Sequence, residues 1–419
     1  METLIEGLQN FYTGFVNHPD FYKYLSIPVI ASLLGWGTNW LAIKLSMWPL
    51  EFVGIKEPWL GWQGVVPRQI KKMAGIMTDQ VISKLGTLSD FFKELEPEKI
   101  ASHLAGTVSM RIEEYTDELM LEKNPVMWEN TPLLVKNRVY RRAKRHIPEI
   151  VEEIMDSLSA NIEAVVDLKH MIVTRMSEDK VLLVNILNDI GKPEFDFVIR
   201  SGLIFGLPLG IIQMLCWYLY PNPWLLPAFG IIVGGFTNFL ALNLIFRPLN
   251  PVKVFGFTFQ GRFLKRQDEV SEGFCRILTQ EVLTVSTLMQ ALQNGPRSDR
   301  ARMMIKQQLK PFLEGGVVKT IAQLTVGPSG YVDLKNSIEQ RVFELSIQHT
   351  DDPILNRERG AVAELAFRKR MEEMSAEEFQ ELLRPAFQED EWILIALGAA
   401  LGFMAGLAQL FFVFGQSFV

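Results

Sequence analysis

The stretch 35-GWGTNWLAIKL-45 places a Thr-Asn pair in the middle of an apolar run that is long enough to cross a membrane. A second stretch, 234-GGFTNFLALNL-244, places another Thr-Asn pair in nearly the same setting. A side-chain amide in hydrocarbon needs a partner, because an unmade hydrogen bond there costs several kcal/mol. Both stretches therefore predict membrane-spanning helices that carry a polar layer. The side chains of this layer are Thr38, Asn39, Thr237 and Asn238.

The composition favours a membrane protein. The chain has 419 residues, of which 48% are hydrophobic, and its mean hydropathy of +0.13 is high for a soluble enzyme of this length. A net charge of -6 gives no global case for nucleic-acid binding. The two cysteines, Cys216 and Cys275, cannot form a disulfide framework and suit a reducing compartment. The beginning METLIEGLQNFYTGF lacks the positive region of a signal peptide, so we expect no cleavage there.

Four segments are long and apolar enough to span a bilayer, which requires about 20 residues. Two of them are joined only by 221-PNPW-224, which predicts a tight hairpin of two spans. The two long segments between the spans look helical, so the expected fold class is an all-α integral membrane protein. The predicted spans cover residues 26–48, 201–220, 225–246 and 392–414, the long segments cover 49–200 and 247–391, and residues 1–25 form an N-terminal segment.

Basic residues near the ends of the spans predict the orientation in the membrane. Lys and Arg gather on the side of the two long segments, whereas the other side offers only Lys23. Since positive loops stay in the cytoplasm, we expect the long segments to be cytoplasmic and both termini to lie outside.

The chain carries one pattern twice, with its parts in the same order. The pattern has a Thr-Asn pair in a span, then Pro-Leu, then Gln-Gly, and a closing Gly-x-x-x-Gly-x-x-Gln span. Such ordered matches predict two tandem copies. Each copy holds two spans, so both have the same membrane orientation as a parallel repeat. The matched pairs include Pro49-Leu50 with Pro248-Leu249, Gln63-Gly64 with Gln260-Gly261, and 206-GLPLGIIQ-213 with 402-GFMAGLAQ-409, which places the repeats at residues 26–220 and 225–414.

Three local patterns predict finer structure. Apolar residues recur every three or four positions after Pro148, which suits the first turn of a helix. Ser375 with Glu378 is typical of a capping box at the start of the helix before the last span. The partial alternation in 253-KVFGFTFQG-261 predicts a small hairpin at the membrane surface.

At this point the residues resemble a known family. The Thr-Asn-x-x-Ala span, the following Pro, the Gln-Gly pair and the closing span are similar to those of the YheB-like (YjiN-type) bacterial membrane proteins. The resemblance covers nearly the whole chain. It implies a multi-pass protein of the bacterial cytoplasmic (inner) membrane, in a family of unknown function with no assigned reaction or substrate. Two features depart from the pattern, since Leu264 stands where the first copy has Pro67, and Lys44 lies inside a span.

Small residues and glutamines on the spans leave two interpretations open. Small-x-x-x-small motifs permit close helix packing, so the polar layer could be a set of interhelical hydrogen bonds. Polar residues inside a membrane also mark binding or transport sites. Gln213 and Gln409 complete the predicted intramembrane polar layer, and they could belong to either arrangement. The small residues in these motifs are Ala31, Gly35, Gly206, Gly210, Gly230, Gly234, Gly402 and Gly406.

The run 136-KNRVYRRAKRH-146 predicts a basic, amphipathic helix. It could be a solvated face, or it could bind anionic lipid headgroups, which attract each basic residue by about 1 kcal/mol. We do not expect nucleic acid as the partner, because aromatic residues are not interleaved with the basic ones. The candidates for headgroup contact are Arg138, Arg141, Arg142, Lys144 and Arg145.

Motifs of catalysis are missing from the sequence. It has no phosphate-binding Gly-x-x-x-x-Gly-Lys-Ser/Thr, Gly-x-Gly-x-x-Gly, His-Glu-x-x-His or Gly-x-Ser-x-Gly. We therefore expect no enzyme, no catalytic residue, no metal site and no cofactor. The favoured function is a non-catalytic membrane protein whose helices bind anionic lipid or a protein partner. The alternatives are a transporter or lipid-moving device with a polar site at the repeat interface, in an oligomer, and an enzyme on the cytoplasmic helices.

Overall fold

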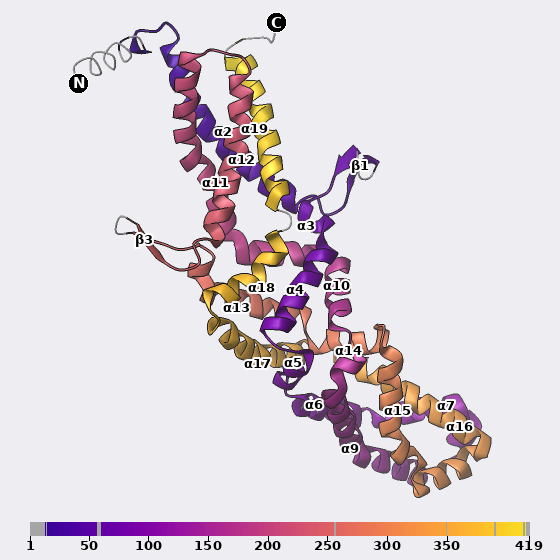
Figure 1. Ribbon diagram of the computed structural model, residues 1–419. Helices are drawn as coiled ribbons and strands as arrows, with labels where there is room; N and C mark the ends of the chain where they lie inside the picture. The colour runs from indigo at the N-terminus through magenta and orange to yellow at the C-terminus, as the bar shows by residue number, and fades with distance from the viewer. Residues whose placement is uncertain are drawn as a thin grey trace. The chain divides into compact units, whose positions relative to one another are not determined.

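The computed structural model is almost entirely helical, which confirms the all-α class (Figure 1). Apart from helices, the described chain contains two short strand pairs. Parts of the predicted segments lie outside the described residues, namely most of the N-terminal segment, residues 57–59, 255–256, 349 and 389–390 of the two long segments, and residue 414 at the end of the fourth span. The structure describes residues 13, 15–56, 60–254, 257–348, 350–388, 391–413 and 415.

The chain forms two compact units, which we describe separately. Each unit is assembled from segments that are far apart in the sequence. The first unit is built from Met1–Met77, Asp179–Val270 and Met374–Val419, and the second from Thr78–Glu178 and Ser271–Glu373.

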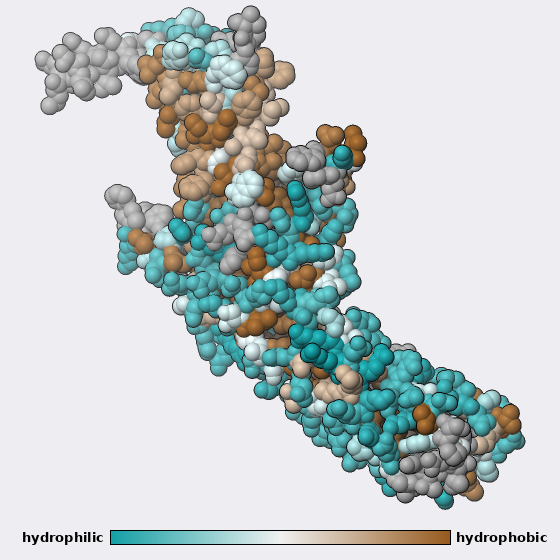
Figure 2. Space-filling model, turned by 45° about the vertical axis from the view of Figure 1, so that its right-hand side comes forward, coloured by the Kyte–Doolittle hydropathy of each residue, from teal (hydrophilic) through white to brown (hydrophobic). Residues whose placement is uncertain are grey.

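Four helices of the first unit are long and apolar enough to cross a membrane. They expose large apolar side chains, such as Val29, Trp36 and Ile204, over much of their surface, and Figure 2 shows brown side chains gathered there. In water this exposure would be unfavourable, whereas acyl chains would cover it. The four helices are α2 (Phe21–Met47), α11 (Lys180–Leu219), α12 (Leu225–Phe246) and α19 (Glu391–Val413).

The ends of these helices follow from local chemistry. Trp48 and Arg247 leave the helical conformation, with φ/ψ of -134/152° and -134/151°, because each precedes a proline. α11 begins at Lys180, well before the predicted span at residue 201. The helix extends this far because Asp179 caps it by accepting a hydrogen bond from the Leu182 amide at 3.1 Å.

The spans pack in two antiparallel pairs, α2 with α11 and α12 with α19. The start of α2, the α11–α12 connection and the end of α19 lie at one end of the bundle (Figure 1). An apolar cluster closes this end around the fully buried Trp217. Its other buried members are Tyr24, Ile27, Met214, Leu226 and Leu410.

Short elements of the first unit follow α2 and α12 or precede α19. The hairpin expected within residues 253–261 is present, and a matching hairpin follows α2. The first hairpin is tied to its span by the Trp62 indole, which donates a 2.9 Å bond to the Leu45 carbonyl. These elements are β1 (Val53–Lys56), β2 (Leu60–Trp62), α3 (Val65–Arg68), β3 (Val252–Val254), β4 (Phe257–Phe259), η1 (Leu264–Arg266) and α18 (Ala376–Gln388), and α4 (Ile70–Lys84) and α13 (Gln267–Ile277) start here.

The second unit consists of helices. Its two halves meet in ion pairs such as Arg359 with Glu96 and Arg370 with Glu94. Besides the remainders of α4 and α13, it contains α5 (Leu88–Glu94), α6 (Pro97–Met110), α7 (Ile112–Lys123), α8 (Pro125–Glu129), α9 (Leu133–Val165), α10 (Leu168–Glu178), η2 (Leu278–Val282), α14 (Val285–Asn294), α15 (Ser298–Glu314), α16 (Gly316–Gln348) and α17 (Pro353–Glu372).

Pro148 lies inside α9, so the prediction that it starts a helix is wrong. The helix begins one residue after Pro132 and continues through Pro148. Pro148 removes the helical hydrogen bond of the Lys144 carbonyl. Because both residues are exposed, water can replace that bond and the helix tolerates the proline.

Helix caps that depend on two side chains three residues apart agree with the sequence pattern. The predicted capping box is confirmed, since Glu378 accepts hydrogen bonds from the main-chain amide and hydroxyl of Ser375 at 2.9 and 2.8 Å. Two further boxes, Thr87 with Asp90 and Thr284 with Thr287, begin α5 and α14.

Candidate functional site

The two intramembrane asparagines bond to main-chain oxygens of the neighbouring helix. Asn39 Nδ2 donates to the Val198 carbonyl at 2.8 Å, and Asn238 Nδ2 donates to the Leu394 carbonyl at 3.0 Å. Both asparagines are almost fully buried. These interhelical bonds go to main-chain oxygens and not from one asparagine to the other, because each asparagine faces the helix with which its own span is paired.

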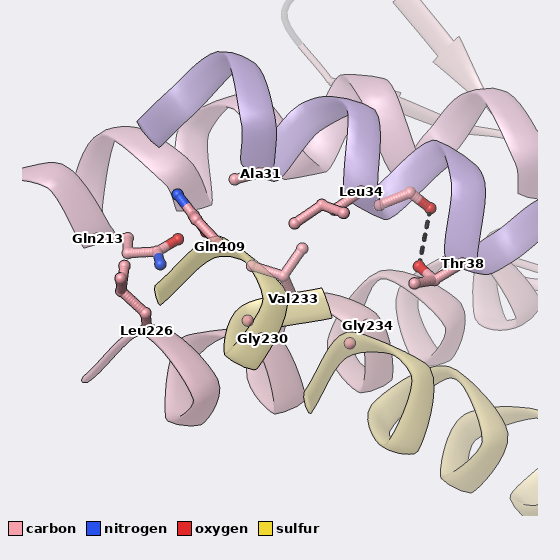
Figure 3. A pocket seen from close by; sticks show the side chains of 12 residues that line it. Ala31, Leu34, Thr38, Gln213, Leu226, Gly230, Val233, Gly234 and Gln409 are labelled. Carbon is pink, nitrogen blue, oxygen red and sulfur yellow. Dashed lines mark hydrogen bonds between the residues drawn. The ribbon is translucent and has the colours of Figure 1, made fainter. Parts of the chain in front are cut away.

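The threonines of the polar layer have different roles. Thr38 donates to the Gly35 carbonyl of its own helix at 3.2 Å, a local bond that Figure 3 marks. Thr237 donates instead to Asn39 Oδ1 at 3.4 Å and thereby links α12 to α2. The polar layer thus connects the two helix pairs through a single side-chain hydrogen bond among the described residues.

Glycines bring the main chains of each pair into direct contact. A Cβ atom on Gly35 would lie 2.6 Å from the Gly202 oxygen, and one on Gly234 would lie 2.1 Å from the Gly398 oxygen. Gly210 meets Pro28 and Gly406 meets Leu226 and Pro227 in the same way. Any larger side chain at these positions would push the helices apart.

A small pocket lies inside the bundle, with a volume of about 10 Å³. Gln213 and Gln409 line it, and in Figure 3 their amide ends lie toward the same end of the pocket, away from Thr38. Gln409 Nε2 in this pocket and Asn238 Oδ1, which does not line it, are each buried without a hydrogen-bond partner in the described structure. The other lining residues are Ala31, Leu34, Gly35, Thr38, Leu226, Gly230, Val233, Gly234, Gly402 and Gly406.

The chemistry of this pocket is limited by its size and its lining. A cavity of about 10–15 Å³ holds a single water molecule, and the free Gln409 amide would be a suitable donor to that water. None of the lining residues is ionisable. Among the described residues, no group of three His, Cys, Asp or Glu side chains is placed to hold a metal ion.

A buried ion pair in the first unit was not expected from the sequence. Both oxygens of Glu194, on α11, accept hydrogen bonds from Arg266 at 2.8 and 2.7 Å. Glu194 is 5% exposed, and Arg266 also binds the exposed Glu269 at 2.8 Å. Burial lowers the pKa of Arg266, but the bonds to the two carboxylates outweigh it and the net pKa is raised. Periodicity could not reveal this pair, because its partners are far apart in the sequence.

The predicted basic residues form an exposed stripe on α9. All five headgroup candidates are exposed, and none forms an ion pair with a described residue. Arg141 Nε donates to the Asn137 carbonyl of its own helix, at 3.2 Å. The opposite face of the helix is buried through Tyr140 and Ile147. The stripe is therefore available to a partner.

The start of α9 is held firmly against α7 and α8. Asp117 accepts a hydrogen bond from the Trp128 indole at 2.9 Å and another from the Tyr140 hydroxyl. The two rings pack edge to face with centroids 6.2 Å apart, and the Lys136 amine lies 5.0 Å over the Trp128 ring. Burial, followed by the bond to Asp117, raises the pKa of Tyr140.

Comparisons with known proteins support the membrane class. The chain is 29% identical over 99 residues to UPF0754 membrane proteins of Staphylococcus aureus, including those of strains JH9 and Newman. The match covers 23% of this chain and 26% of each relative's length. These relatives belong to an uncharacterised membrane family, and their names do not confirm the YheB-like (YjiN-type) naming. No family model matches the chain, and no solved structure matches it significantly.

Proposed function

We propose that this chain is a non-catalytic protein of the bacterial cytoplasmic (inner) membrane that holds a basic helix against anionic lipid headgroups. The observation that carries this proposal is the exposed stripe on α9, which has no ion-pair partner among the described residues. The proposed orientation of the chain in the membrane rests on the basic residues near the spans, which favour long segments in the cytoplasm and both termini outside.

The tandem repeat is part of the proposal, and equivalent contacts support it. When the copies are aligned on their Thr-Asn pairs and on their closing spans, Val198 corresponds to Leu394, the two carbonyls that accept from the asparagines. The same alignment matches Gly202 with Gly398 and Pro28 with Pro227, which make equivalent glycine contacts. Gln63 and Gln260 likewise donate to the carbonyls of Leu50 and Leu249, at 2.7 and 3.1 Å.

The bundle itself acts as an anchor in this proposal. Main-chain contact at the glycines and bonds to main-chain oxygens favour a locked arrangement of α2, α11, α12 and α19 over one that opens. The internal pocket has room for about one water molecule, which is too little for a solute. These features support packing as the role of the polar layer.

Anionic lipid is a suitable partner for the stripe on physical grounds. The cytoplasmic side of a membrane carries negative charge, and each nearby Lys or Arg contributes about 1 kcal/mol of attraction. Five such residues would contribute roughly 5 kcal/mol at the surface, and salt would weaken the binding. A protein partner with an acidic surface is the other outcome that the experiment can reveal.

Vesicle flotation tests the proposal directly. The full-length protein in nanodiscs of phosphatidylcholine is mixed with vesicles that contain either phosphatidylcholine alone or added phosphatidylglycerol. We expect flotation only with phosphatidylglycerol, and at least about tenfold less flotation when the stripe is changed to glutamate. The stripe variant carries Arg138→Glu, Arg141→Glu, Arg142→Glu, Lys144→Glu and Arg145→Glu.

A matched control variant separates the effect of the stripe on flotation from the effect of the total charge. Five other residues of the second unit are also exposed and without an ion pair to a described residue. Their reversal gives the same net charge, and we expect this variant to float like the unchanged protein. Equal flotation of the stripe variant and the unchanged protein would reject the lipid-binding role. The control changes are Arg276→Glu, Arg300→Glu, Lys310→Glu, Arg357→Glu and Lys369→Glu.

One observation favours the second candidate, a transporter or lipid-moving device in an oligomer. Gln409 Nε2 is buried and unpartnered among the described residues, beside Gln213 in the pocket. Translocation of a fluorescent phospholipid in proteoliposomes tests this candidate. Flux that is lost in a stable Asn39→Leu/Asn238→Leu protein would favour it, whereas no flux in the unchanged protein would leave the anchor as the better account.

A further inference from the structure

The end of the second unit that begins α9 exposes large apolar side chains. Leu133 and Leu134 are 75% and 81% exposed, and Val135 is 46% exposed. Val126, on the adjacent helix α8, is 71% exposed. Leucine side chains gain most of their hydrophobic free energy only when they are buried. Exposed apolar groups next to charged ones therefore indicate a surface that another phase or molecule covers.

Leu134 and the basic stripe lie on the same face of α9, and Leu133 precedes Leu134 at the start of the helix. Helical periodicity places Leu134, Arg138, Arg141 and Arg145 in one row. At 1.5 Å per residue, Arg138 lies about 6 Å and Arg141 about 10 Å along the axis from Leu134. The polar region on each side of a bilayer is roughly 5–8 Å thick. When Leu134 is at the hydrocarbon border, the first arginines are therefore level with the phosphates.

The apolar end is rigid rather than frayed. Trp128 and Tyr140 pack on each other, both bind Asp117, and Lys136 covers the Trp128 ring. These contacts hold the first turns of α9 in place, so the leucines are presented without a large ordering cost. No acidic residue stands in the first turn of α9 to repel an anionic surface.

We propose that the start of α9 inserts Leu133 and Leu134 into the hydrocarbon border of an anionic bilayer, with the arginine row behind them at the phosphates. This rests on the proposed function and deepens it, because it adds an apolar contact to the electrostatic one. Charge complementarity identifies the partner as an anionic bilayer. An apolar tip, formed by Leu133 and Leu134 and followed by a row of exposed arginines, fits a surface with anionic headgroups over acyl chains. Both kinds of contact then contribute to binding.

A fluorescent probe at the tip tests insertion. Leu134→Cys in a Cys216→Ala background is labelled with an environment-sensitive dye, since the remaining Cys275 is fully buried. The labelled full-length protein is placed in phosphatidylcholine nanodiscs, in phosphatidylglycerol nanodiscs, and in phosphatidylcholine nanodiscs with added phosphatidylglycerol vesicles. We expect a blue shift in at least one of the two anionic settings and none with phosphatidylcholine alone. The setting that gives the shift tells whether the tip meets its own membrane or a second one.

The matched control places the same probe on α17, at Leu365→Cys in the same background. Leu365 is 68% exposed but lies outside the tip, and we expect no shift there in any setting. No shift at residue 134 in either anionic setting would overturn the insertion. A shift that is equal with phosphatidylcholine would overturn the requirement for an anionic surface.

A second pair of variants separates the inference from the proposed function. Leu133→Ser/Leu134→Ser should reduce flotation with phosphatidylglycerol vesicles about tenfold and make the residual binding fully salt-sensitive. Ile354→Ser/Leu365→Ser, two exposed positions on α17, should leave flotation unchanged. If the serine tip variant floats normally while the glutamate stripe variant does not, insertion is rejected and headgroup binding stands. If neither variant changes flotation, both proposals are rejected.

Discussion

Asn39 on α2 and Val198 on α11 are joined by a 2.8 Å hydrogen bond from a side-chain amide to a main-chain oxygen. The same oxygen also accepts from the Ser201 hydroxyl at 2.6 Å. An asparagine at this depth thus fixes the axial position of one span against the next. Such bonds contribute about 0.6–2 kcal/mol in membranes.

Replacing Asn39 with leucine should destabilise the bundle. We expect Asn39→Leu to lower the free energy of unfolding by about 1–2 kcal/mol, because the α2–α11 bond and the link to Thr237 are both lost. Thermal unfolding in detergent measures the change. Asn243→Leu is the control, since the side chain of Asn243 bonds, among the described residues, only to the Phe239 carbonyl of its own helix. Equal melting temperatures for the two variants would contradict this role of Asn39.

The glycine contacts predict opposite effects of the same substitution at two sites. Gly234→Ala should destabilise the α12–α19 pair by about 1–3 kcal/mol, because its Cβ would lie 2.1 Å from a main-chain oxygen that cannot move alone. Gly37→Ala should be neutral or stabilising by up to about 1 kcal/mol, since nothing lies within 4 Å of its Cβ. Thermal unfolding of both variants provides the comparison. A stable Gly234→Ala protein would show that the two main chains are farther apart.

In the buried pair of Glu194 and Arg266, removing the arginine should destabilise the protein more than removing the glutamate. Arg266→Met should cost about 3 kcal/mol, because it leaves the buried Glu194 carboxylate without its partner. Glu194→Leu should cost less, because Arg266 keeps the exposed Glu269. A double-mutant cycle of unfolding free energies measures the coupling, and the double variant should be more stable than Arg266→Met alone.

The two capping boxes of the second unit, at the starts of α5 and α14, should differ in their stability at low pH. Hydrogen bonds from Thr87 hold the pKa of Asp90 below its ordinary value, whereas the box at Thr284 uses the Thr287 hydroxyl, which does not titrate in this range. Because the folded pKa is lowered, the cap contributes fully above the ordinary Asp range and is lost as pH falls through the lowered pKa. We expect protection against hydrogen exchange to fall in acid at the start of α5 and to persist at the start of α14. Parallel loss at both helices would contradict the assignment.

Much of the architecture could be predicted from local patterns. The third predicted span, 225–246, agrees with α12, and the box at Ser375 and the hairpin near residue 253 are present. These features depend on residues within one or two turns of each other. The start of α9 was missed because the pattern around Pro148 is also local. A proline favours the first turn of a helix, but an exposed site tolerates a proline inside the helix.

The sequence by itself determined that four apolar helices exist and that polar side chains lie within them, because hydropathy and helical period are local properties of the chain. Only the tertiary structure decided which groups those side chains meet. Asn39 binds a carbonyl rather than Asn238, and Glu194 finds Arg266, because helix packing brings together residues that no local pattern connects. Packing also decided that one face of α9 is buried while its arginine row and its leading leucines remain exposed.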